Sequence, residues 1–253
     1  MNPSVLIAAP TSDVKDYCFD KYVQQLKSFT YPEYDTFIVD NSKDKFHIKK
    51  FWKEGINGVH YPVKGHPTQW LTDCQNIIRG VFLDAGFDYL FMLESDVFVP
   101  DWFIWEGIAQ LEAQKADVYT WTYEIEKDME MTPCIHGEWK KGAKLTGKVP
   151  SRGVGYSWLG RGCVDIESLG YGDYKAYGAG IGATIISRKV LESVIFRVDL
   201  KVSKKAFSDS YFYYDTKRLG FKTIIETNQI AEHDIRGGFN KWGNNKYSSS
   251  KRN

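Results

Sequence analysis

Short, continuously apolar segments alternate with segments of helical spacing along the first half of the chain. Strands that are apolar without a break are buried on both faces, as in parallel sheets, where a crossover helix follows each strand. The alternation therefore predicts an α/β fold with a Rossmann-like, mainly parallel central sheet and helices on both faces. The strands are expected within residues 4–13, 34–44, 58–63, 88–96 and 116–125, and the helices within residues 17–30, 46–55, 68–86 and 100–115.

The same pattern returns after an irregular middle region. Residues 177–196 predict a strand and then a helix, residues 208–221 predict a helix ended by Gly220, and residues 222–234 predict a last strand. Residues 127–177 are rich in Gly, aromatic and basic side chains but show no clear period. We therefore expect a long loop region there, of the kind that is usually functional or flexible.

Charge and cysteine content exclude little but point to a compartment. The formal net charge is +1 at pH 7, so the overall charge identifies no partner. No apolar run approaches the ~20 residues of a membrane helix, and the N-terminal run is too short for a signal peptide, so we expect a cytoplasmic protein without a membrane segment. Cysteines without a CxxC pair argue against a zinc site and favour free thiols in a reducing compartment; they are Cys18, Cys74, Cys134 and Cys163.

Polar residues follow three of the predicted strands. The carboxyl ends of parallel strands meet at one edge of the sheet, and ligands of open α/β sheets bind beyond that edge. Three polar strand ends at one edge predict a binding site there. They are Thr11–Ser12–Asp13, Asp40–Asn41–Ser42 and Glu94–Ser95–Asp96.

Glu94 and Asp96 are two residues apart in an extended segment, so their side chains point the same way. Two half-buried carboxylates repel each other and lose hydration, and a divalent cation such as Mg²⁺ or Mn²⁺ removes both costs. Such an ion would also bind the phosphates of a nucleotide-type substrate. The alternative is a solvated turn in which one Asp caps a helix.

Two residues from distant segments are candidates for the same site. His233 follows the last predicted strand and would be a third metal ligand, although a lone His is more often structural. Asp209 stands at a predicted helix start. It is either an acid favoured there by the helix dipole or a general base.

Four segments, in this order, resemble the glycosyltransferases of the GT-A fold, close in pattern to glycosyltransferase family 2. They are "VLIAAPTSD", "FIVDNSKD", "DYLFMLESDV" with the helix "TDCQNIIRGVFLDAG" before it, and the run from "GAGIGATIIS" to "IAEHD", which together span residues 4–126 and 177–236. The resemblance implies one GT-A catalytic domain over residues 1–236, made of a nucleotide-sugar-binding half (1–126), a basic Gly-rich region (127–176) and an acceptor-side half (177–236), followed by a basic tail (237–253).

The resemblance also implies a role for each matching residue. Asp96 and His233 would bind Mn²⁺ or Mg²⁺, and Glu94 stands at the place of the first DxD acid, where it contacts the metal or the ribose. Asp209 would deprotonate the acceptor hydroxyl in an inverting reaction; if Asp209 is not the base, a retaining mechanism remains open. The donor would be a nucleotide sugar, with a UDP-sugar favoured, and the activity a hexosyl or pentosyl transfer. Pro10, Thr11 and Asp40 would hold the nucleoside. Apart from the resemblance, Ser95 is a further candidate donor contact, and Gly180 in "YGAGIGATI" would let the backbone approach the donor sugar or the acceptor closely.

Basic residues gather in two regions without acids, residues 140–161 and 236–252. These two regions would form one of three things: a solvated face, a lid that closes over the donor diphosphate, or a groove that binds a polyanion. The last possibility would make the acceptor DNA with a modified base, which has to be flipped out of the duplex. A glycan is the other acceptor class.

Two other functions would use part of this pattern. A nucleotidyltransferase also needs paired carboxylates, but a Gly-rich loop is expected directly after its first strand, and "APTSDVKD" has no glycine. A non-catalytic carbohydrate- or nucleic-acid-binding protein needs neither Asp209 nor His233.

Overall fold

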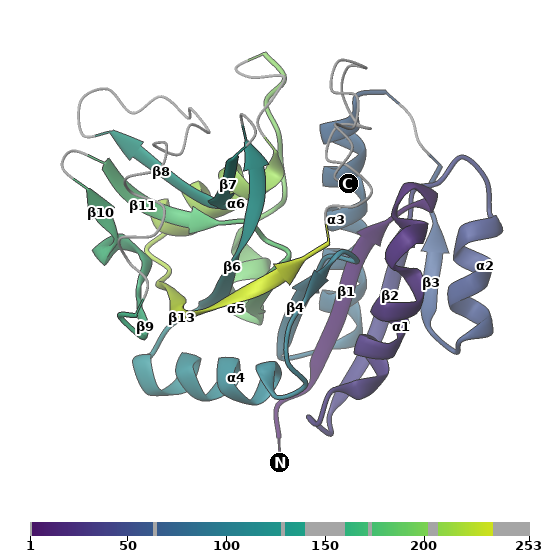
Figure 1. The fold of residues 1–253 in the computed structure, drawn as a ribbon, viewed down its shortest axis with the longest axis horizontal. Coiled ribbons are helices and arrows are strands. Elements are labelled where there is room, and N and C mark those ends of the chain that lie inside the picture. Colours follow the sequence, from purple (N-terminus) through teal and green to yellow (C-terminus); the bar gives the residue numbers. More distant parts are fainter. Residues whose placement is uncertain are drawn as a thin grey trace, which may run out of the picture.

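The computed structural model describes residues 2–62, 65–127, 130–139, 160–171, 174–201 and 207–234 (Figure 1). A large curled sheet forms its centre. Its strands lie in the order β3 (Asn57–His60), β2 (Tyr34–Asp40), β1 (Val5–Thr11), β4 (Tyr89–Leu93), β12 (Ala183–Ser187), β6 (Val118–Lys127), β13 (Thr223–His233) and β5 (Val97–Phe98).

The central sheet is mainly parallel, as the sequence predicts. β1 pairs in parallel with both β2 and β4, β2 with β3, and β6 with β13. β12 lies between β4 and β6 and is antiparallel to both, so β4 and β6 point the same way. The carboxyl ends of β1, β2, β4, β6 and β13 therefore meet at one edge.

Helices cover both faces of this sheet (Figure 1). Alternate residues of β1 belong to different hydrophobic clusters: Ile7 shares a cluster with Phe51 and Ile104, whereas Leu6 shares one with Ile78 and Phe212. One face is covered by α1 (Phe19–Ser28), α2 (Phe46–Lys53) and α4 (Phe103–Gln114), and the other by α3 (Pro67–Ala85), α5 (Arg188–Ser193) and α6 (Ser208–Arg218).

The ends of α3 follow directly from its sequence. Pro67 opens the helix, where its missing N–H costs nothing, and Gly86 closes it with a left-handed φ of 82° that a side chain would disfavour. The predicted helix over residues 68–86 is therefore confirmed. Among the described residues, no helix combines the length and the apolar character needed to cross a bilayer.

The expected loop region is wrong where the structure describes it. Residues 127–177 contribute several short strands, and the strand expected at the start of residues 177–196 is two strands with a turn between them. Short strands of mixed polarity are decided by their pairing partners and not by their own pattern. The added elements are β7 (Glu130–Pro133), β8 (Ile135–Trp139), β9 (Cys163–Asp165), β10 (Gly170–Tyr171), β11 (Tyr174–Ala179) and a 3₁₀ turn, η2 (Ile166–Ser168), and β10, β11 and β8 form a second sheet.

Candidate active site

Asp96 lies in the tight turn between β4 and β5, and side chains before and within α1 hold that turn. The Tyr22 hydroxyl donates to the Leu93 carbonyl oxygen (2.8 Å), and the Cys18 thiol donates to the Ser95 carbonyl oxygen (3.0 Å). The backbone N–H of Asp234 donates to the carbonyl oxygen of Asp96 (2.8 Å). The end of β13 is thereby fixed next to the predicted carboxylate pair.

The two oxygens of the buried Asp96 carboxylate differ in their hydrogen-bond and ion-pair partners. Its Oδ2 contacts the Lys15 ammonium and lies 3.4 Å from both His233 Nε2 and the Tyr17 hydroxyl. Its Oδ1 is buried and accepts no hydrogen bond from the described residues. Burial acts to raise the pKa of Asp96, but the hydrogen bond with His233 and the charge of Lys15 outweigh burial and lower it. Asp96 is therefore ionised, with a free oxygen available to a cation.

His233 is oriented for a role at Asp96. Its Nδ1 lies 2.7 Å from the Glu124 carbonyl oxygen, to which it can only donate, so Nε2 is the nitrogen that faces Asp96. Metal-binding histidines in proteins are commonly fixed by such a second hydrogen bond. The Tyr123 ring lies against the imidazole with a centroid separation of 5.0 Å. His233 therefore lies beside Asp96, and metal binding by these two residues stays a prediction.

Lys15 was not a candidate from the sequence, and it comes from a 3₁₀ helix, η1 (Asp13–Cys18). Replacing it by methionine should lower the free energy of unfolding by about 3 kcal/mol, because the buried charge of Asp96 loses one of its two cationic partners. Mn²⁺ should restore part of this loss, since a cation at Asp96 replaces the missing positive charge. Urea unfolding with and without Mn²⁺ measures both effects.

The matched control for this variant is Lys27→Met, which removes an exposed ion pair with Glu54. That pair should contribute less than about 1 kcal/mol, with or without Mn²⁺. A Lys15→Met protein as stable as the wild type would contradict the role given to the Lys15–Asp96 contact.

Glu94 differs from Asp96 in its environment. Burial raises the pKa of Glu94, and the charge of Asp96 adds to the rise, while Lys15 and His233 oppose it. In the described part of the chain, Glu94, Asp96 and His233 do not gather their ligand atoms within 4.8 Å of one another. Glu94 therefore stays a prediction as a metal ligand.

The predicted nucleoside contacts lie at the expected edge. Thr11 is buried, and its hydroxyl lies 3.0 Å from that of Ser95. Asp40 is also buried, and its two oxygens lie 3.0 Å from Nδ1 of His47 and from Nδ1 of His60. Neither histidine was singled out from the sequence. Burial opposes ionisation of Asp40, but hydrogen bonds from His47, Ser42 and His60 lower its pKa.

The two remaining donor candidates are Pro10 and Gly180. Pro10 lies in β1 and is partly exposed near the same edge. Gly180 has a structural explanation, because a Cβ there would lie 2.3 Å from the Tyr123 hydroxyl. The absence of a side chain at Gly180 thus makes room for Tyr123. The contact of either residue with a donor stays a prediction.

Asp209 lies in the first turn of α6 and pairs with a histidine that was not predicted from the sequence. Its Oδ2 lies 3.0 Å from His136 Nε2, and its Oδ1 accepts the Ser210 N–H (2.7 Å). Burial acts against both charges, but the carboxylate raises the pKa of His136 to about 10 and His136 lowers the pKa of Asp209. His136 lies in β8, inside the region predicted as loop, where the sequence gives no periodic signal.

The basic regions 140–161 and 236–252 lie outside the described residues, apart from Gly160 and Arg161. The lid and the polyanion groove therefore stay predictions.

No protein-family model and no curated protein matches the sequence, but solved structures do match. S. aureus TarS 1-349 in complex with UDP-GlcNAc matches with a TM-score of 0.57 and 15% identity, over 90% of this chain and 57% of that one. The mannosyltransferase PcManGT from Pyrobaculum calidifontis, in complex with GDP-Man and Mn2+, matches with a TM-score of 0.52 and 12% identity, over 90% and 57%.

The chain has the GT-A fold. A mycobacterial protein also matches, with a TM-score of 0.53 and 14% identity over 93% of this chain and 68% of that one. The chain spans a little over half the length of TarS 1-349 and of PcManGT, 57% in each case. The similarity confirms the predicted GT-A architecture, and the resemblance to family 2 in particular stays a prediction.

Proposed function

We propose that the chain is a metal-dependent glycosyltransferase that moves a sugar from a nucleotide-sugar donor to a hydroxyl acceptor. The observation that carries the proposal is Asp96, an ionised carboxylate at the carboxyl edge of a GT-A sheet with one buried oxygen that accepts no hydrogen bond from the described residues. A donor bound at that edge would place its diphosphate beside this carboxylate.

The residues around Asp96 fit a divalent ion. Carboxylate and imidazole ligands suit Mn²⁺, and carboxylate oxygens also suit Mg²⁺, so Asp96 and His233 would hold the ion, with Glu94 as a further or water-mediated ligand. When bound, such an ion neutralises negative charge on the diphosphate leaving group. The same fold holds GDP-Man and Mn2+ in PcManGT, which supports this assignment.

Asp209 is the proposed base. The acceptor oxygen bonds to the anomeric carbon while the bond from that carbon to the diphosphate oxygen breaks, and Asp209 takes the acceptor proton. Attack opposite the leaving group inverts the anomeric centre. The pairing of Asp209 with His136 supports this role, because it keeps the carboxylate ionised and fixes its direction.

The donor class is proposed from the nucleoside edge. We favour a UDP-sugar as donor of a hexosyl or pentosyl group, with Pro10, Thr11, Asp40 and Ser95 on the nucleoside side. TarS, with the same fold, was solved with UDP-GlcNAc. The acceptor is a glycan hydroxyl or, if the basic regions bind a polyanion, a modified DNA base. The cysteines are all free, which supports a reducing, cytoplasmic setting.

A panel of nucleotide sugars tests the donor, with thermal unfolding measured in Mn²⁺ and in EDTA. One donor class should raise the Tm in Mn²⁺ only, and at 100 times its Kd it should add about 2.7 kcal/mol of stability. The matching nucleoside monophosphate is the control, since it lacks the diphosphate that an ion at Asp96 would contact. Lack of protection by every donor would contradict the proposal.

A further inference from the structure

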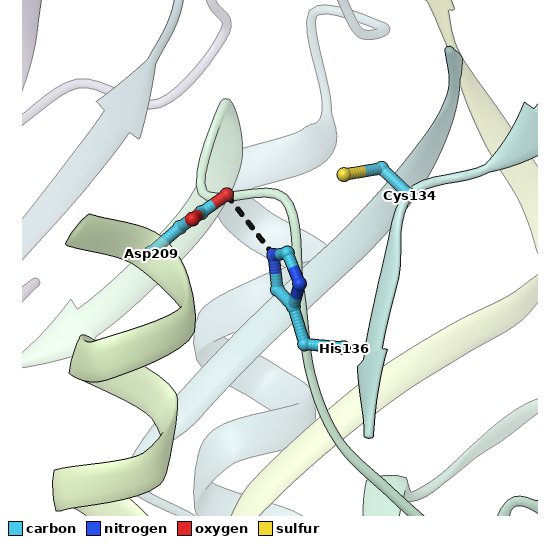
Figure 2. Close-up of side chains that lie close together, drawn as sticks. All are labelled: Cys134, His136 and Asp209. Carbon is cyan, nitrogen blue, oxygen red and sulfur yellow. Dashed lines mark hydrogen bonds and ion pairs between the residues drawn. The ribbon is translucent and has the colours of Figure 1, made fainter. Parts of the chain in front are cut away.

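Three side chains outside the predicted ligand set bring sulfur, nitrogen and oxygen together. Ligand atoms of Cys134, His136 and Asp209 all lie within 4.8 Å of one another. Figure 2 shows the imidazole of His136 beside the Asp209 carboxylate, with the Cys134 sulfur directed toward the same space. Cys134 precedes β8, His136 lies in β8, and Asp209 comes from α6, so the fold and not the local sequence assembles the group.

The backbone holds these side chains in advance. Cys134 and His136 are two residues apart in an extended segment, so their side chains point the same way. The N–H of Cys134 donates to the Tyr123 carbonyl oxygen (2.8 Å), and its own carbonyl oxygen accepts the N–H of Gly180 (2.9 Å). These two hydrogen bonds hold the backbone of Cys134 in place.

The position of α6 is fixed by a second close approach. A Cβ on Gly178 of β11 would lie 2.3 Å from Cγ of Tyr213 in α6, so the glycine lets the helix lie directly on the strand. β11 pairs with β8, and Gly178 lies opposite His136 in that pairing. The contact between Gly178 and α6 therefore places Asp209 of α6 next to His136.

We propose that Cys134, His136 and Asp209 form a second metal site, which takes Zn²⁺ or a similarly soft divalent ion. Thiolate, imidazole and carboxylate are the ligands Zn²⁺ uses in proteins, and three of them leave a fourth position for water. The thiolate gives this site a different metal preference from Asp96–His233, because hard ions such as Mg²⁺ prefer oxygen ligands. The sequence has no CxxC pair, which argued against a zinc site. That argument does not apply to this site, because its ligands are one cysteine, one histidine and an aspartate from the distant helix α6.

A metal ion can reach the Cys134 thiol, and its binding releases protons. The Cys134 side chain is buried, whereas those of His136 and Asp209 remain 12% and 16% exposed, so an ion reaches the thiol past them. Without metal, His136 is hydrogen-bonded to Asp209 (3.0 Å) and to the Ser210 hydroxyl (3.2 Å). Binding exchanges the His136–Asp209 hydrogen bond for metal bonds, and both the Cys134 thiol proton and the His136 Nε2 proton are released to solvent.

This site has a regulatory consequence that rests on the proposed function. Asp209 cannot take the acceptor proton while its oxygen binds a metal ion. Zn²⁺ at this site therefore inhibits sugar transfer, even when Mn²⁺ saturates the site at Asp96.

The experiment is a titration of the metal-free, full-length chain with Co²⁺, a coloured substitute for Zn²⁺. The expected result is one equivalent of a thiolate-to-cobalt charge-transfer band with tetrahedral d–d bands, both removed by added Zn²⁺. The charge-transfer band should disappear in Cys134→Ser and persist in the matched control Cys163→Ser and in Asp96→Asn. A wild-type chain without the band, or a band that survives Cys134→Ser, would overturn the site.

A second variant covers the case in which Cys134→Ser does not fold. His136→Gln keeps the thiol and the carboxylate, so it should retain the band and bind Zn²⁺ at least about tenfold more weakly in a competition titration. Unchanged Zn²⁺ affinity in His136→Gln would also count against the site. Measurements of sugar transfer distinguish the metal site from the proposed function. If the charge-transfer band is present but Zn²⁺ does not inhibit transfer, only the inhibition is refuted. If the chain transfers no sugar at all, only the proposed function is refuted.

Discussion

An Asp96→Asn chain is expected to transfer sugar with a kcat about 10³-fold lower than the wild type, which corresponds to about 4 kcal/mol of transition-state stabilisation. Asparagine keeps the size of the side chain but removes the negative charge, and with it the attraction for the ion and for Lys15. The remaining neutral oxygen is a weak metal ligand. Initial rates of nucleoside diphosphate release, at saturating donor and Mn²⁺, measure the effect.

The control for this variant is Asp88→Asn, directly before β4 and away from its carboxyl end, where the carboxylate accepts from the N–H and the hydroxyl of Ser4. Its kcat should stay within about twofold of the wild type, since surface changes away from the site have small effects. An Asp96→Asn enzyme with wild-type kcat would remove Asp96 from the chemistry and leave a metal-independent mechanism.

Asp209→Asn is expected to lower kcat by 10²- to 10⁴-fold, the usual range for loss of a general base, while donor affinity stays unchanged. The amide still accepts a hydrogen bond from His136, so the local geometry is retained and the loss reports proton transfer. The measurement is a kcat and KM comparison in zinc-free buffer, together with the anomeric configuration of the product.

Asp215→Asn is the matched control, on the same helix but paired with Arg197. It should cost stability without a comparable loss of kcat. Two results would contradict the role of Asp209 as base: an unchanged kcat in Asp209→Asn, or a product that retains the donor's anomeric configuration.

The sheet and its ligand edge were predictable because the signals are local and strong. Continuous apolar runs identify buried parallel strands, and the residues that follow each run must lie at one edge. Asp96 and His233, about 140 residues apart by their numbers, are therefore placed together by topology alone. The structure places His233 Nε2 3.4 Å from Asp96 Oδ2, and their shared role as metal ligands stays a prediction.

Other parts of the site carry no such signal. From the sequence, Lys15 is expected to be an exposed charge in a polar segment. Its contact with Asp96 depends on the 3₁₀ turn of η1. His136 lies in a short strand and Cys134 directly before it, and the strand's partner comes from far along the chain, so no period marks either residue. The histidines around Asp40 come from α2 and β3. Packing of α2 brings His47 to Asp40, and the pairing of β2 with β3 brings His60 there.

The most direct test of the metal-assisted donor site is a calorimetric titration of the donor identified by the panel, in Mn²⁺ and in EDTA, with wild type and Asp96→Asn side by side. The proposed site predicts donor binding by the wild type in Mn²⁺, at least about tenfold weaker binding in EDTA, and no gain from Mn²⁺ in Asp96→Asn. Equal donor affinity in all four titrations would contradict it.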